Sequence, residues 1–91
     1  SIHLMADRPE FFDVDKALTY AKQACEVTDY KHPQALEILA SAYAMGGKLG
    51  DAVKTASQAI EAAQDAGDRE TANRVREMLQ VLQKIQADRH E

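Results

Sequence analysis

The fold of this protein is decided by the stretch PQALEILASAYAMGGKLGDAVKTASQAIEAA, residues Pro33 to Ala63. Apolar residues recur every three or four positions on both sides of Gly46 and Gly47, which is the spacing of an amphipathic helix. They are Leu36, Leu39, Ala40 and Tyr43 on the first side and Ala52, Ala56, Ala59 and Ile60 on the second. The pattern predicts a helical hairpin, with both glycines in the left-handed conformation that ends a helix.

Two further segments carry the same periodicity and are predicted to be helices, residues 13–28 and residues 68–87. Asp13 and Asp68 are placed to cap their first turns, because a short acidic side chain accepts hydrogen bonds from free backbone amides. Pro33 suits the first position of the second helix, which we expect to end near Met45. The third helix is expected from about Asp51 to Ala63 or a little beyond, with Gly67 as its C-terminal stop. The polar residues after Ala87 are expected to fray.

The N-terminal residues are interpreted as the remnant of an element whose beginning is missing. Ser1 to Ala6 is apolar but too short for a stable helix, and Phe11 and Phe12 are expected to pack as part of a connector. The chain as a whole, 91 residues with 45% apolar and 29% charged residues, fits one all-α domain of about four helices.

Composition excludes several classes of function. The formal net charge is −4 and the charges alternate in sign, which argues against nucleic acid as a ligand. Neither a run of about 18 apolar residues nor a secretory signal is found, so this segment predicts no membrane partner. Cys25 is the one cysteine and is expected to be a small buried packing residue, which favours a reducing, cytoplasmic compartment.

The helices repeat one another. Residues 17–26 match residues 52–61 at an offset of 35, with identical residues at five positions, among them Ala21 and Ala56, and Gln23 and Gln58. Leu36, Leu39 and Tyr43 correspond to Ala72, Val75 and Leu79 at an offset of 36. A period in the middle thirties with alternating helix types is typical of a solenoid of helical hairpins.

On these residues the chain resembles the tetratricopeptide repeat family, and in particular the C-terminal repeats of longer bacterial members. Leu36, the Leu39-Ala40 pair and Tyr43 match the first helix of that motif, and Gly47 matches its turn. Two departures are Ala56, where an aromatic residue is usual, and Gln64, where a proline is usual. The resemblance implies antiparallel hairpins stacked as a short α-solenoid: a partial repeat at 13–28, a full repeat at 33–63 and a capping helix at 68–87.

Small residues are expected wherever helix axes approach closely in such a stack. These positions are Ala17, Ala24, Ala40, Ala52 and Ala59. Arg76 occupies the place that corresponds to Ala40, where a following helix would pack, so we interpret the last helix as a C-terminal cap.

The resemblance also implies a binding surface, the inner face lined by the first helix of each repeat. Its candidate residues are Gln34, Glu37, Ile38, Ser41 and Met45, continued by Asn73, Arg74, Glu77 and Gln80. The usual ligand of that face is an extended or helical peptide. Ordinary solvated residues are the alternative for each position, but Ile38 and Met45 fit it poorly, because a solvated face needs no apolar side chains.

Catalysis and metal binding are not predicted. The histidines are His3, His32 and His90, none at a spacing from another ligand that would hold a metal, and the paired aspartates are better explained as helix caps. The expected function is therefore a non-catalytic protein-interaction module or scaffold, without a cofactor. The alternative is a structural segment that caps a longer array and has no peptide ligand of its own.

A weak homodimer is a further expectation. Beside the stripe Val75, Leu79 and Leu82, the last helix carries a second apolar stripe, Met78, Val81 and Ile85, which one neighbouring helix cannot also cover. The N-terminal edge with Phe11 and Phe12 is the other candidate surface. In the opposite interpretation the aliphatic stems of Arg76, Lys84 and Arg89 cover the second stripe and the protein is a monomer.

Overall fold

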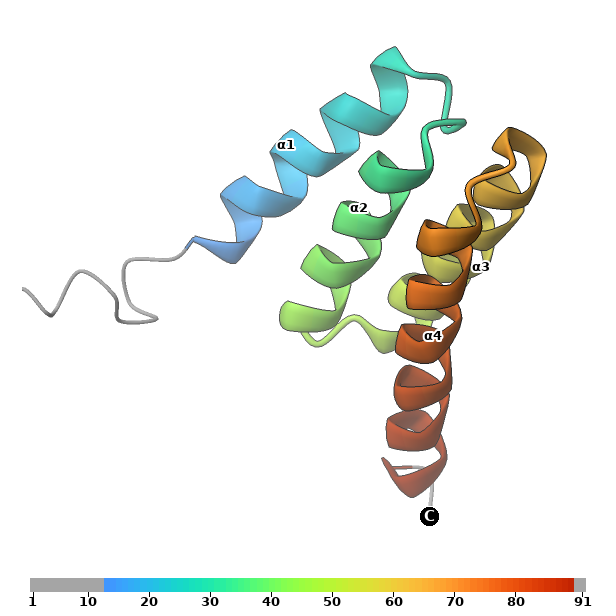
Figure 1. Ribbon diagram of the computed structural model, residues 1–91. Coiled ribbons are helices and arrows are strands. Elements are labelled where there is room, and N and C mark those ends of the chain that lie inside the picture. Colours follow the sequence, from blue (N-terminus) through green and yellow to red (C-terminus); the bar gives the residue numbers. More distant parts are fainter. Residues whose placement is uncertain (1–12, 90–91) are drawn as a thin grey trace, which may run out of the picture.

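The computed structural model describes residues 13–89, which form four helices (Figure 1): α1 (Val14–Val27), α2 (Pro33–Met45), α3 (Leu49–Ala66) and α4 (Arg69–Arg89). All regular secondary structure in residues 13–89 is helical, so the all-α prediction is confirmed for this part of the chain. The predicted N-terminal remnant and the Phe11–Phe12 connector lie outside the described residues.

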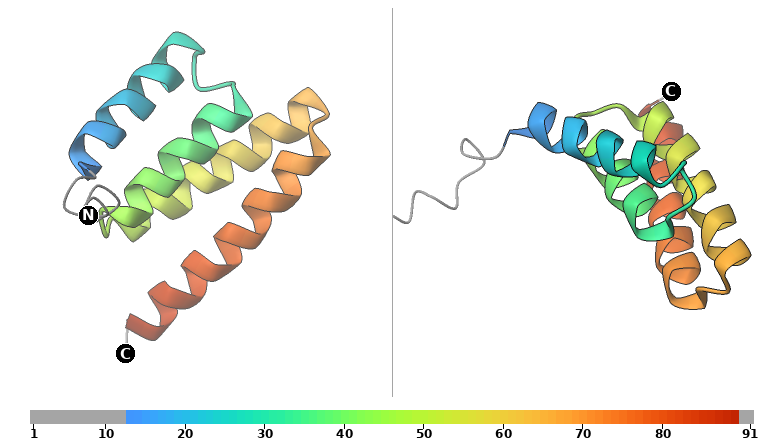
Figure 2. Two further views of the ribbon diagram at one scale, coloured as in Figure 1. Left: turned by 60° about the vertical axis from the view of Figure 1, so that its left-hand side comes forward. Right: turned by 90° about the horizontal axis from the view of Figure 1, so that it is seen from above.

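Successive helices run antiparallel and pack side by side, α1 on α2, α2 on α3 and α3 on α4 (Figures 1 and 2). α2 and α4, which are not consecutive, are also in contact. α2 therefore touches every other described helix, and the second half of α4 extends beyond its neighbours (Figure 1).

Three helices are preceded by a capping residue, whose side chain accepts a hydrogen bond from the backbone amide of the third residue of the helix. Asp13 Oδ1 accepts from the Lys16 amide at 3.1 Å, and Asp68 Oδ1 accepts from the Thr71 amide at 3.0 Å. The His32 ring caps α2, its Nδ1 accepting from the Ala35 amide at 3.3 Å. The two aspartate caps were predicted, whereas the His32 cap was not.

The three turns end their helices in the same way. At least one residue after the helix has a positive φ, and the amides of two residues in the turn donate hydrogen bonds to carbonyls of the last helical turn. After α3, the Asp68 amide donates to Ala63 O at 2.8 Å and Gly67 has φ +72°. After α2, Gly47 has φ +78°, but Gly46 has φ −84°, so the prediction of two left-handed glycines is wrong for Gly46. After α1 the left-handed residues are not glycines; they are Asp29 and Tyr30.

Two helices extend beyond their predicted limits. α3 begins at Leu49 instead of Asp51, and it ends at Ala66, a little beyond Ala63 and directly before the predicted stop at Gly67. α4 stays helical to Arg89, beyond the expected end at Ala87. The residues added at the C-terminal ends of both helices are exposed, whereas Leu49 at the start of α3 is half-buried.

The core is built mostly from small residues that let helix axes approach closely. Ala40, Ala52, Ala56 and Ala59 are fully buried, with Leu36 and Val75 beside them. Ala24 is exposed, so the expectation of close packing there is wrong: α1 buries its Leu18, Ala21 and Cys25 side against α2, and Ala24 points away from it. The same alanine at the equivalent position of α3, Ala59, is buried between α2 and α4.

Candidate functional site

The exposed side of α2 carries the first group of predicted site residues. Gln34, Ile38, Ser41 and Met45 follow one another at intervals of three or four and so share one side of the helix. Ile38 is 60% exposed and Met45 is 59% exposed, whereas α2 residues on the opposite side are buried. The surface therefore presents two large apolar side chains that the fold does not use.

An ion pair joins this side of α2 to α4. Arg74 Nε donates to Glu37 Oε2 at 2.7 Å and Arg74 Nη2 donates to Glu37 Oε1 at 2.9 Å, a two-pronged contact that fixes both side chains. The hydrogen bonds and charge of Glu37 raise the pKa of Arg74 above its already high ordinary value, so Arg74 keeps its charge. The structure thus brings together two residues that sequence analysis placed on one face.

A second contact between α2 and the start of α4 engages Gln34. Its Nε2 donates to Asp68 Oδ2 at 3.2 Å, while the other oxygen of Asp68 caps α4. Hydrogen bonds from the side chain and backbone of Thr71 are the main cause that lowers the pKa of Asp68, with smaller contributions from Arg74 and Gln34. Gln34 is exposed and is held in place at the edge of the face.

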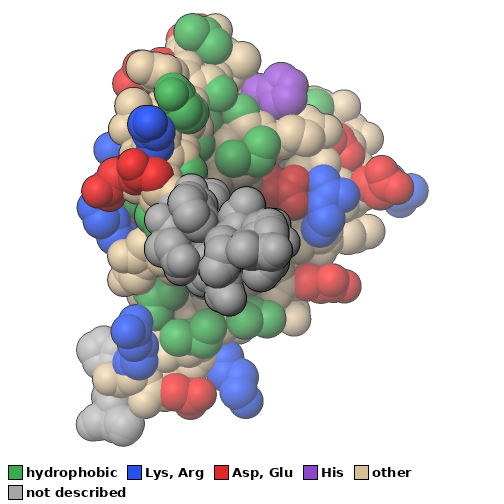
Figure 3. Space-filling model, turned by 90° about the vertical axis from the view of Figure 1, so that its left-hand side faces the viewer, with side chains coloured by type: hydrophobic (Ala, Val, Ile, Leu, Met, Phe, Trp, Pro, Cys, Tyr) green, Lys and Arg blue, Asp and Glu red, His purple; other side chains and the backbone are tan. Residues whose placement is uncertain are grey.

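The second half of α4 continues the surface. Val81 is 58% exposed and Ile85 is 40% exposed, while Met78 is half-buried against the core. Both side chains are thus partly accessible, and the interpretation in which the stems of Arg76, Lys84 and Arg89 cover this stripe and keep the protein a monomer stays a prediction. Figure 3 views the molecule from the α1 side. At the bottom of this view, toward the C-terminal end of the chain, hydrophobic side chains lie among acidic and basic ones.

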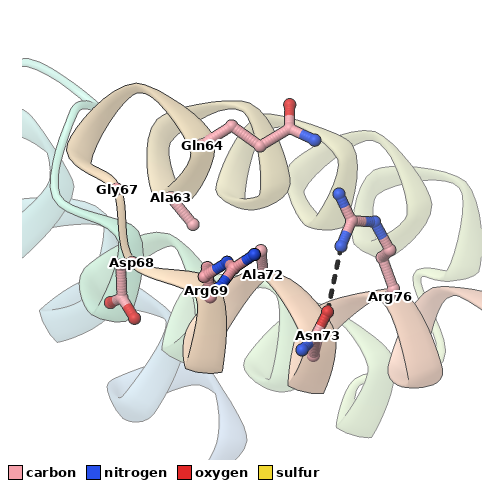
Figure 4. A pocket seen from close by; sticks show the side chains of 8 residues that line it. All are labelled: Ala63, Gln64, Gly67, Asp68, Arg69, Ala72, Asn73 and Arg76. Carbon is pink, nitrogen blue, oxygen red and sulfur yellow. Dashed lines mark hydrogen bonds between the residues drawn. The ribbon is translucent and has the colours of Figure 1, made fainter.

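The Asn73 side chain takes no part in the Glu37–Arg74 ion pair. Its Oδ1 accepts a hydrogen bond from Arg76 Nη1 at 3.1 Å, and both residues line a groove between α3 and α4 (Figure 4). The groove has a volume of about 640 Å3, and its lining residues are Ala63, Gln64, Gly67, Asp68, Arg69, Ala72, Asn73 and Arg76. Asn73 therefore belongs to a different surface from the rest of the predicted site.

Sequence analysis did not predict this groove, although the repeat contains the signal. At the offset of 36, Ala72 and Arg76 correspond to Leu36 and Ala40, two buried residues of α2. The groove thus lies on the side of α4 that corresponds to the buried side of α2 formed by Leu36 and Ala40. Its two arginines, Arg69 and Arg76, are exposed and make it polar.

Other chemistry-bearing groups have structural surroundings. Cys25 is fully buried, as predicted, and burial raises the pKa of its thiol. Tyr43 is half-buried, with Lys22 Nζ 5.8 Å from the centre of its ring. Within residues 13–89, no three His, Cys, Asp or Glu side chains lie close enough together to hold a metal ion. None of the described helices has both the length and the apolar character needed to cross a membrane.

Comparison of the chain with family models, with curated proteins and with solved structures gives no match. The resemblance to the tetratricopeptide family stays a prediction from the chain's own sequence repeat.

Proposed function

We propose that this chain is a short tetratricopeptide-like stack of helical hairpins that binds a segment of another protein, without catalysis, on the face of α2 and the first half of α4. The observation that carries the proposal is the pair of exposed apolar side chains, Ile38 and Met45, on a helix side that ends at the Glu37–Arg74 ion pair. Apolar anchors beside fixed charges are typical of peptide-binding surfaces.

Helix packing supports the stacked arrangement. α2 and α4 are related by the sequence repeat and touch each other although α3 separates them in the chain. Contact between equivalent helices of successive hairpins is what builds a continuous face in a helical solenoid. A partner segment lying along that face would cross from Ile38 toward the Glu37–Arg74 pair.

A selection of random displayed peptides on the wild-type protein tests the proposal. Selected peptides are expected to bind at least about tenfold more weakly to Ile38→Asp and Met45→Asp, because a charge replaces an apolar anchor. Tyr20→Asp is the matched control: Tyr20 is 63% exposed and belongs to α1 rather than to α2 or α4, so its replacement should leave affinity unchanged. Selected peptides that bind all three variants equally would place the binding surface elsewhere.

A second candidate function is that of a structural cap for a longer array, and one observation favours it. Arg69 and Arg76 replace what in α2 are the buried Pro33 and Ala40, so the α3–α4 edge is more polar than the equivalent edge of α2. A polar outer edge is a property of terminal repeats. In this case the peptide selection should give no binder that depends on Ile38 or Met45.

A further inference from the structure

One side of α4 begins with Arg74, which is paired with Glu37 of α2, and with Met78, which is half-buried against the core, and it becomes exposed in the second half of the helix. Its residues, which we name the α4 stripe, are Arg74, Glu77, Met78, Val81, Lys84, Ile85 and Asp88. They recur at intervals of three or four and so share one side of the helix. Val81, at 58% exposure, and Ile85, at 40%, are its apolar centre, and all four charged members are exposed.

The charges of the α4 stripe alternate along the helix in a symmetric way. Arg74 and Asp88 lie seven residues on either side of Val81, and they have opposite charges. Glu77 and Lys84 lie four residues before it and three after it, again with opposite charges. Reversing the direction of the helix about Val81 therefore exchanges Arg74 with Asp88, and it brings Glu77 and Lys84 each to within one residue of the other's position.

We propose that the α4 stripe binds a second copy of this chain in antiparallel orientation, with the two-fold axis near Val81. In this pairing Glu77 faces the partner subunit's Lys84, and Val81 meets the partner subunit's Val81. Arg74 faces the partner subunit's Asp88; Arg74 is 52% exposed beside Glu37, so its guanidinium can contact a second carboxylate. A parallel pairing in register would set like charges against each other, which is unfavourable.

The size of the α4 stripe makes this dimer a weak one. A single pair of helices buries less surface than the roughly 1,200–2,000 Å2 of a stable interface. We expect a dissociation constant between about 10 μM and 1 mM, rising with salt because the flanking ion pairs are exposed. The pairing shares Arg74 with the proposed peptide-binding face but leaves Ile38 and Met45 open, so different variants test the two proposals.

Sedimentation equilibrium of the full chain at low salt tests the pairing by charge reversal. Glu77→Lys and Lys84→Glu should each raise the dissociation constant about tenfold, because each sets like charges together twice in the symmetric dimer. The double variant restores opposite charges in the same places, and its dissociation constant should return to within about twofold of the wild-type value. Val81→Glu should abolish the dimer.

Two charge reversals on α3, Lys54→Glu and Glu61→Lys, serve as controls, since both residues are exposed and the variants change the net charge as the α4 variants do. They should leave association unchanged. Circular dichroism of each variant at low concentration establishes that the helices persist. A wild type that is monomeric at about 1 mM, or a double variant that associates no better than the single ones, overturns the proposal.

Discussion

The carboxylate of Glu37 on α2 accepts two hydrogen bonds from the guanidinium of Arg74 on α4, although 37 residues separate them in the chain. The separation is one repeat of 36 residues plus one. Glu37 therefore contacts the residue next to its own repeat equivalent, Asn73, because α2 and α4 lie against each other. This pair and the Gln34–Asp68 bond are the polar contacts that join α2 to α4 in residues 13–89.

The ion pair should make a small, salt-dependent contribution to stability. Replacing Glu37 by Gln removes the charge but keeps the shape, so the melting temperature should fall slightly at low salt. The difference from wild type should shrink at high salt, since exposed charges are screened. Thermal melts at two salt concentrations measure it, and a difference that grows with salt would contradict an electrostatic origin.

Packing of the small residues predicts a large effect at one alanine and none at its repeat equivalent. Ala59→Leu should lower the free energy of unfolding by about 1–3 kcal/mol, because Ala59 is fully buried between helices. Ala24→Leu should have little effect, since Ala24 is exposed. Urea unfolding of both variants is the measurement, and equal stability of the two would mean that the core is wrongly placed.

The left-handed turn after α3 predicts opposite effects at two glycines. Gly67→Ala should cost about 1 kcal/mol, because Gly67 has φ +72° and a side chain is strained there even with open space around it. Gly50→Ala is the control: Gly50 is helical, has open space around it, and should become neutral or slightly more stable. Thermal melts that show Gly67→Ala to be as stable as wild type would contradict a left-handed conformation at Gly67.

The turn after α1 offers a stabilising substitution. Asp29 has φ +57°, which glycine adopts at lower cost, so Asp29→Gly should raise the free energy of unfolding by up to about 1 kcal/mol. Asp29→Ala keeps the strain of a side chain and should not be stabilising. Urea unfolding distinguishes the two, and a loss of stability in the glycine variant would disagree with a left-handed residue at this position.

Acid should weaken the start of α4. Because the folded pKa of Asp68 lies below its ordinary 3.8, its contribution to stability is present above that value and is lost as the pH falls through the lower folded pKa. Asp68→Asn should therefore lose less stability than wild type between pH 5 and roughly pH 2. Melts across this range measure the difference, and identical acid profiles would show that the Asp68 carboxylate has no stabilising role.

The sequence by itself determined the helices and most of their ends, because these depend on local chemistry. Apolar spacing gave α1 to α4, and Asp13, Pro33 and Gly67 mark limits that neighbouring backbone groups alone impose. Where a local signal was absent, the prediction missed the feature: Asp29 and Tyr30 turn left-handed without glycine.

Only the tertiary structure decided which side of each helix is covered. Ala24 and Ala59 are equivalent in the repeat, yet one is exposed and the other buried, because α1 packs on α2 while α3 lies between α2 and α4. Glu37 and Asn73 are also equivalent, but Glu37 reaches the neighbouring α4, whereas Asn73 faces a groove beyond which no described helix lies. A repeated sequence predicts that equivalent positions are buried to the same extent. Their burial differs because the helices that carry them have different numbers of neighbouring helices.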